Sequence, residues 1–169
     1  SNTGPVAVAD TATVAEDASL TSIDVITNDT DVDGDDLTLT AVSTSGTGTV
    51  GVNADGVSVD YTPAANFNGE VTITYTVSDG TDSDETGTLT ITVTAVNDLP
   101  TGSVTIGGTA TQGQLLTASN DLADADGLET ITYSWSNGQT GSSITLGQGD
   151  VGETITVTAS YTDTLGTEE

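Results

Sequence analysis

Alternation of apolar residues with threonine is the sequence feature that most restricts the fold of this chain. Residues 71–77 read VTITYTV, and residues 89–96 read LTITVTAV. A period of two puts apolar side chains on one face of an extended strand and threonine, a good strand former, on the other. No segment carries a convincing helical period, so the chain is predicted to be all-β.

Seven strands are predicted in the first part of the chain. They span residues 6–15, 20–26, 37–43, 47–53, 57–62, 70–78 and 86–96. The segments between them are rich in Asp, Asn and Gly, which are the residues that tight turns require. Seven short strands in about 100 residues is the pattern of an immunoglobulin-like or cadherin-like β-sandwich.

Four motifs then return in the same order. The copies pair residues 2–5 with 97–100, 11–13 with 109–111, 31–34 with 124–127, and 71–79 with 155–163. A fixed order of related motifs is the signature of an internal repeat. We therefore predict two tandem Greek-key β-sandwich domains, residues 1–98 and 99–169.

The second predicted domain is the shorter one. The sequence reaches Glu169 where its last strand should begin, so we expect this domain either to lack that strand or to receive it from something else, and to be less ordered at this end. Trp135 falls on a predicted strand of this domain and is expected in its core.

The charge of the chain limits its partners. There are 26 acidic residues and no Lys, Arg or His, which gives a formal charge of −26. No carboxylate can pair with a basic side chain, and such a polyanion repels nucleic acid and anionic lipid. No apolar run approaches the roughly 20 residues of a membrane-spanning helix. We expect cations as partners, no nucleic acid and no membrane insertion.

Composition also bears on stability and on catalysis. The chain is 34% hydrophobic, which leaves cores of modest size, and it has no cysteine for disulfides. Small cores usually need an additional staple, and metal is the one that remains. The residues that supply most general bases and oxyanion-stabilising cations are absent, so we expect no enzymatic activity.

The densest acidic stretch is NDTDVDGDD at residues 28–36. Alternate Asp residues followed by Gly let a tight turn direct several oxygens to one point, and calcium takes about six to eight oxygen ligands. Thr40 stands where an EF-hand loop carries its bidentate Glu, and no helices flank the loop, so this is not an EF-hand. Asp29, Asp31 and Asp33 are candidate calcium ligands.

Sandwich topology predicts where the other acidic loops gather. One end of the first domain should hold Asp31, Asp33 and Asp79 beside Asn2. The other end should hold Glu16 and Asp17 with Asn66, Asn68 and Glu70, beside the departing Asn97 and Asp98. The second domain should present Asp124, Asp126 and Asp163 to the same linker. We expect ligands from both domains and the linker to converge on one joint.

These motifs resemble those of a known family. Residues 93–100, VTAVNDLP, resemble the cadherin inter-domain linker. The first copy is similar, over nearly its full length, to the bacterial cadherin-like repeats of large secreted adhesins of the RTX type. The resemblance implies calcium held between successive domains, and by position its ligands would be Glu16, Asn97, Asp98, Asp124, Asp126 and Asp163.

The resemblance is not complete. Residues 66–70, NFNGE, stand where cadherins carry an acidic Leu-Asp-Arg-Glu stretch, and this leaves the number of ions open. The glycine-rich RTX nonapeptide is absent as well. The second copy resembles a neighbouring repeat type of the same adhesins more loosely.

The resemblance implies a calcium-rigidified structural extender of an adhesin on the bacterial cell surface, active in cell adhesion or biofilm formation. Its partners would be calcium and the neighbouring repeats of the same polypeptide. The alternative is a binding module for polysaccharide or for another copy of the adhesin. A third interpretation is that the acidic loops are solvated turns of a salt-tolerant surface.

Overall fold

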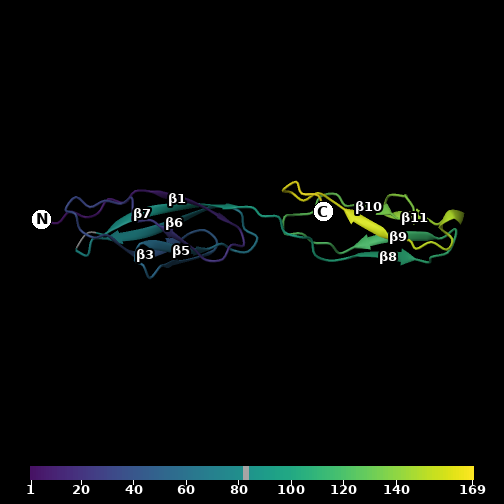
Figure 1. The fold of residues 1–169 in the computed structure, drawn as a ribbon, viewed down its shortest axis with the longest axis horizontal. Helices are drawn as coiled ribbons and strands as arrows, with labels where there is room; N and C mark the ends of the chain where they lie inside the picture. The colour runs from purple at the N-terminus through teal and green to yellow at the C-terminus, as the bar shows by residue number, and fades with distance from the viewer. Residues whose placement is uncertain (82–83) are drawn as a thin grey trace. The chain divides into compact units, whose positions relative to one another are not determined.

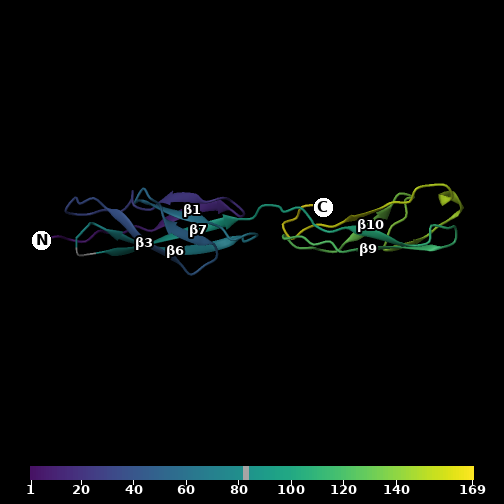
Figure 2. The same ribbon diagram turned by 90° about the horizontal axis from the view of Figure 1, so that it is seen from below.

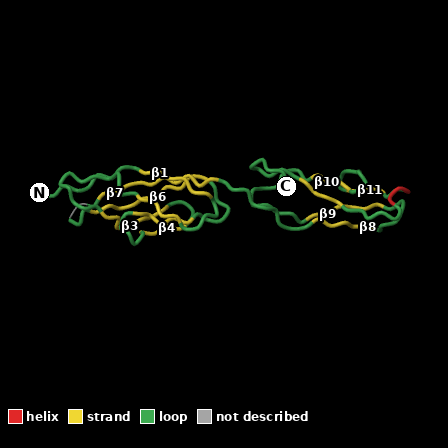
Figure 3. The backbone as a smooth tube through the Cα atoms, in the orientation of Figure 1, coloured by secondary structure: helices red, strands yellow, loops and turns green. Residues whose placement is uncertain are grey.

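The computed structural model describes residues 1–81 and 84–169. The chain divides into two compact units, Ser1–Val96 and Asn97–Glu169, called here the first unit and the second unit. Each unit is built from β-strands in two layers, as two views show (Figure 1, Figure 2). In the described residues the only helix is a short 3-10 turn, Gln148–Asp150 (Figure 3). The all-β prediction is confirmed.

The first unit is a sandwich of two sheets. Its strands are β1 (Asp10–Ala15), β2 (Thr21–Asp24), β3 (Thr38–Thr44), β4 (Thr49–Val52), β5 (Ser58–Thr62), β6 (Gly69–Ser78) and β7 (Glu85–Thr94). One sheet has the order β1-β7-β6-β3 and the other β2-β5-β4. All neighbours are antiparallel except β1 and β7, which run parallel. This arrangement brings the chain start and the β2–β3 and β6–β7 loops to one end of the unit.

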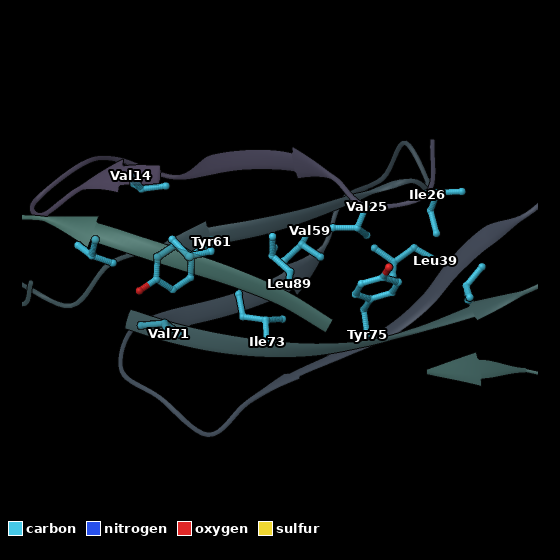
Figure 4. Packing of buried hydrophobic residues seen from close by; sticks show 13 residues of the cluster. Val14, Val25, Ile26, Leu39, Val59, Tyr61, Val71, Ile73, Tyr75 and Leu89 are labelled. Atoms are coloured by element: carbon cyan, nitrogen blue, oxygen red, sulfur yellow. The ribbon is translucent and has the colours of Figure 1, made fainter. Parts of the chain in front are cut away.

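The alternation of β6 and β7 determines the core. The apolar residues of β6 are fully buried and pack with those of β7, in the core that Figure 4 shows. The intervening threonines of both strands lie on the outer face. Tyr75 lies across Gly87 on β7, where a Cβ atom would stand 2.1 Å from the Tyr75 ring. A glycine is therefore required opposite this tyrosine.

One predicted strand differs from the structure. Residues 6–15 were expected as a single strand, but Val6 makes an antiparallel bridge to Thr30, and β1 begins only at Asp10. The segment changes its partner between these points, from Thr30 to the parallel neighbour β7, so its ladder is interrupted.

The second unit has fewer strands. These are β8 (Val104–Gly108), β9 (Leu115–Asn120), β10 (Thr132–Trp135), β11 (Ser143–Thr145) and β12 (Val157–Ser160), in sheets ordered β11-β9-β8 and β10-β12. Trp135 is buried at 4% exposure and donates from Nε1 to the Gly141 carbonyl at 2.9 Å. The expectation that this tryptophan belongs to the core is confirmed. No helix in the described part of the chain is long and apolar enough to cross a membrane.

Candidate metal centre

The loop between β2 and β3 is folded around Asp31. Its Oδ1 accepts the amides of Asp33 at 2.7 Å and Gly34 at 3.0 Å. Gly34 has a φ of +86°, a conformation that glycine adopts readily. The turn occupies one oxygen of Asp31 and leaves Oδ2 buried, with no hydrogen-bond partner in the described residues.

Three carboxylates meet at this loop. Oxygens of Asp31, Asp35 and Asp79 all lie within 4.8 Å of one another. Asp79 follows β6 and is buried at 7% exposure, whereas Asp35 is exposed. Two sequence-predicted ligands, Asp31 and Asp79, are thus brought together. Sequence reasoning missed Asp35, although it continues the alternation of acidic residues just after Gly34.

The hydrogen bonds around these carboxylates affect them differently. The Asn2 side chain donates to Asp79 Oδ2 at 2.7 Å, and the Thr81 amide donates to Oδ1 at 2.8 Å. These bonds lower the pKa of Asp79 and favour its charged form. Desolvation, followed by repulsion from Asp31 and Asp79, raises the pKa of Asp35. A cation bound here would relieve that repulsion, and the chain has no basic side chain to do so.

The donor set fits calcium. Oxygens within 4.8 Å of one another can share an ion at the calcium–oxygen distance of about 2.3–2.6 Å. All three groups are carboxylates, the hard ligands that calcium prefers. The unpartnered, buried Oδ2 of Asp31 is a further sign, because an uncompensated carboxylate oxygen is costly to bury. Asp31, Asp35 and Asp79 would hold the ion, and it would neutralise their mutual repulsion.

The side chains of Asp33 and Asp29, which belong to the same loop, bind other partners. Asp33 Oδ2 accepts the amide of Thr3 at 2.6 Å, which attaches the start of the chain to the loop. Asp29 points inward at 8% exposure, and its Oδ1 accepts the Val8 amide at 2.7 Å. Burial raises the pKa of Asp29, whose Oδ1 also lies 3.5 Å from the Tyr75 hydroxyl. Neither residue belongs to the three-carboxylate group.

Glu16 and Asp17 lie in the loop after β1, at the opposite end of the first unit. Glu16 is 3% exposed, and its Oε1 accepts the amide of Val96 at 2.6 Å. Asp17 Oδ1 accepts the amide of Asn66 at 3.0 Å. Glu16 therefore holds the chain where it leaves the first unit, and Asp17 joins two loops.

The second unit repeats the turn of the first. Asp124 Oδ1 accepts the amide of Asp126 at 2.8 Å, as Asp31 does for Asp33. Asp126 Oδ2 accepts the amide of Asp98 at 2.5 Å, as Asp33 does for Thr3. In both units the repeated motif therefore binds the backbone of the segment that enters the unit.

The remaining predicted ligands of the second unit have mixed surroundings. Asp163 is 1% exposed; its Oδ1 accepts the Thr167 amide at 2.7 Å, and its Oδ2 is buried with no hydrogen-bond partner among the described residues. The Tyr161 hydroxyl donates to Asp124. Asn97 donates to Glu169 at 2.9 Å. Among the described residues, the acidic side chains of this unit form no group as close as that of Asp31, Asp35 and Asp79.

Comparison with known proteins gives a family and several similar solved structures. The profile of the family described as bacterial Ig domain matches residues 2–94. The tandem Ig repeats of Dlar are 12% identical, with a TM-score of 0.31, over 98% of this chain and 93% of that one. The N-terminal Ig1-2 module of the Drosophila receptor protein tyrosine phosphatase DLAR is also 12% identical, with a TM-score of 0.30 over 98% and 91%. No curated protein matches the chain.

Proposed function

This chain belongs to the bacterial Ig domain family, and we propose that it is a calcium-binding structural extender of a bacterial cell-surface adhesin. Ig-like repeats are usually non-catalytic and are typical of surface proteins. The proposal adds calcium to that role. Calcium would stiffen a string of repeats, which would project an adhesive region away from the cell.

The observation that carries the proposal is the group of three carboxylates at Asp31, Asp35 and Asp79. They lie within 4.8 Å of one another in a chain with no Lys, Arg or His. Like charges this close repel one another unless a cation or a proton intervenes. Calcium accepts such a donor set, with water or other oxygens completing its coordination.

The link from metal to stiffness runs through the segment that enters each unit. Asn2 donates to Asp79, and Thr3 donates to Asp33. In the second unit Asp98 donates to Asp126 in the same manner. An ion that orders these acidic loops would also restrain the segments bonded to them, because Asp79 takes part in both and Asp33 lies in the same loop as Asp31 and Asp35. Asp124, Asp126 and Asp163, with Asn97 and Asp98, are the proposed ligands of the second unit.

The aromatic residues favour an extender over a sugar-binding module. Carbohydrate sites generally present exposed rings, but Tyr61, Tyr75, Trp135 and Tyr161 are all buried at 5% exposure or less. Tyr133 and Phe67 are half-buried and pack against the cores. A sugar platform would have to be built without a fully exposed aromatic ring.

Small-angle X-ray scattering tests the proposal. Calcium should narrow the distribution of interatomic distances relative to chelator. Magnesium at equal ionic strength is the control, because salt alone screens a chain of charge −26. The double variant Asp124→Asn with Asp126→Asn should stay folded and lose the response. Identical curves in calcium, magnesium and chelator would contradict the extender role.

A further inference from the structure

A second group of oxygen atoms surrounds the hydroxyl of Tyr75 in the first unit. Asp10 Oδ2 lies 2.9 Å from the hydroxyl oxygen, the Val8 carbonyl oxygen 3.2 Å and Asp29 Oδ1 3.5 Å. Tyr75 belongs to β6, and Asp10 is the first residue of β1. Val8 precedes that strand, and Asp29 lies in the loop between β2 and β3. These four residues are called here the Tyr75 cluster.

The Tyr75 cluster has more hydrogen-bond acceptors than donors. The hydroxyl has one hydrogen and can donate it to only one of the three oxygens. The Val8 amide donates to Asp29 Oδ1 at 2.7 Å, and the Asn28 side chain donates to Asp10 Oδ1 at 2.9 Å. Asp29 Oδ2 is buried, with no hydrogen-bond partner in the described part of the chain, in a residue that is 8% exposed. A buried carboxylate oxygen without a partner is costly.

The Tyr75 cluster also lacks a counter-charge. Burial, followed by repulsion from Asp10, raises the pKa of Asp29, and burial raises the pKa of Asp10. Burial and the adjacent Asp10 raise the pKa of Tyr75 as well, so its hydroxyl stays neutral. Two carboxylates therefore share one hydroxyl in a chain that has no Lys, Arg or His. A water molecule could supply hydrogens to these oxygens but not the missing positive charge.

We propose that the Tyr75 cluster is a second cation site of the first unit, with Asp10, Asp29 and the Val8 carbonyl as its ligands. Carboxylate and carbonyl oxygens are hard ligands that calcium accepts in irregular arrangements, whereas magnesium demands a near-ideal octahedron. Two carboxylates balance the two charges of a calcium ion. Val8 is 43% exposed and Asp10 is half-buried, so an ion can reach the cluster from solvent.

This site is separate from the candidate metal centre. The group within 4.8 Å consists of Asp31, Asp35 and Asp79, and it includes no member of the Tyr75 cluster. The inference therefore does not rest on the proposed function, because either site could bind an ion without the other.

The position of the site indicates what a bound ion would do. Val6 is bridged to Thr30, and four residues later Asp10 begins the parallel pairing of β1 with β7. Val8 lies midway between these two points. An ion held by Val8, Asp10 and Asp29 would bind the entering segment to the unit where that segment changes its partner.

Nuclear magnetic resonance of the chain with ¹³C at the tyrosine Cζ atoms tests the site. Tyr75→Phe identifies the Tyr75 signal among the four tyrosines. At pH 7, calcium should shift this signal in a saturable way. The Tyr61 signal should move little, because the Tyr61 hydroxyl donates to the Thr47 carbonyl and lies outside the cluster. Asp10→Asn should weaken the calcium response of Tyr75 by about tenfold or more, because it removes one of two charged ligands.

Two further variants serve as controls. Asp60→Asn removes the same charge from a half-buried aspartate of the same unit, on β5, and should respond as the wild type does. Asp35→Asn should keep the Tyr75 response. A response lost in Asp35→Asn but kept in Asp10→Asn would overturn the second site and leave the candidate metal centre intact. A Tyr75 signal that moves with pH but not with calcium would also overturn it, since protons alone would then occupy the cluster.

A crystal structure of the wild type grown in calcium needs no variant to fold. The inference predicts an ion at about 2.3–2.6 Å from oxygens of both Asp10 and Asp29. A water molecule in that position, or no bound atom there, would overturn the inference.

Discussion

Asp163→Asn should change the stability of the second unit in opposite directions with and without calcium. Asp163 is 1% exposed: one carboxylate oxygen accepts the Thr167 amide, and the other is buried with no hydrogen-bond partner in the part of the chain that the structure describes. Asparagine keeps the bonded oxygen and replaces an unpaired charge with a neutral amide, which costs less to bury. Without metal, the variant should be more stable by about 1–2 kcal/mol.

In calcium, the wild type should instead be the more stable of the two proteins. A ligand at about 100 times its dissociation constant adds about 2.7 kcal/mol to the stability of the wild type. The variant lacks one proposed ligand and should gain much less. For a unit of this size, each 1 kcal/mol corresponds to about 4–8 °C in melting temperature. The wild type should therefore melt several degrees above Asp163→Asn in calcium, although it melts below it in chelator.

Trp135 fluorescence during thermal unfolding measures the effect, first in chelator and then in calcium. Glu153→Gln is the matched control, because it removes one charge from an exposed position of the same unit. The control should respond to calcium as the wild type does. If Asp163→Asn is the less stable protein in chelator, or if it gains as much from calcium as the wild type, Asp163 is not a metal ligand.

Two other predictions concern the first unit. Gly87→Ala should lower its free energy of unfolding by about 3 kcal/mol or more in urea denaturation, since the new methyl group would overlap the Tyr75 ring; a loss below about 1 kcal/mol would contradict the packing. Without calcium, stability should rise as pH falls from 7 toward 4, because burial raises the pKa of Asp10 and Asp29 and the folded state holds their protons more tightly than the unfolded chain. Below pH 3.8, the ordinary pKa of an aspartate, stability should fall, because hydrogen bonds from Thr27 lower the pKa of Asp24 in the folded state. A stability that declines steadily from pH 7 downward would contradict this prediction.

Much of the fold could be predicted from local pattern. The alternation at residues 71–77 predicts both the strand β6 and its buried face, because period two alone assigns side chains to faces. The parallel pairing of β1 with β7 could not be predicted in this way. It depends on a contact between distant segments and on the change of partner between Val6 and Asp10.

The candidate metal centre shows the same limit. The run of alternate acidic residues indicates a metal loop but not which carboxylates converge. Asp29 is drawn inward by the amide of Val8, which is distant in sequence, and Asp33 is bonded to Thr3. The turn around Asp31 places Asp35 in the group instead. Which carboxylates converge therefore depends on backbone amides elsewhere in the chain, and the local motif does not reveal these.

Calorimetric titration of calcium into the metal-stripped protein tests the central claim most directly, with Asp35→Asn and Asp36→Asn measured beside the wild type. Both residues are exposed neighbours of equal charge, but only Asp35 belongs to the three-carboxylate group. The account predicts a saturable heat for the wild type, weaker binding by about tenfold or more for Asp35→Asn, and nearly unchanged binding for Asp36→Asn. No heat from the wild type, or equal losses in the two variants, would contradict a calcium site at Asp31, Asp35 and Asp79.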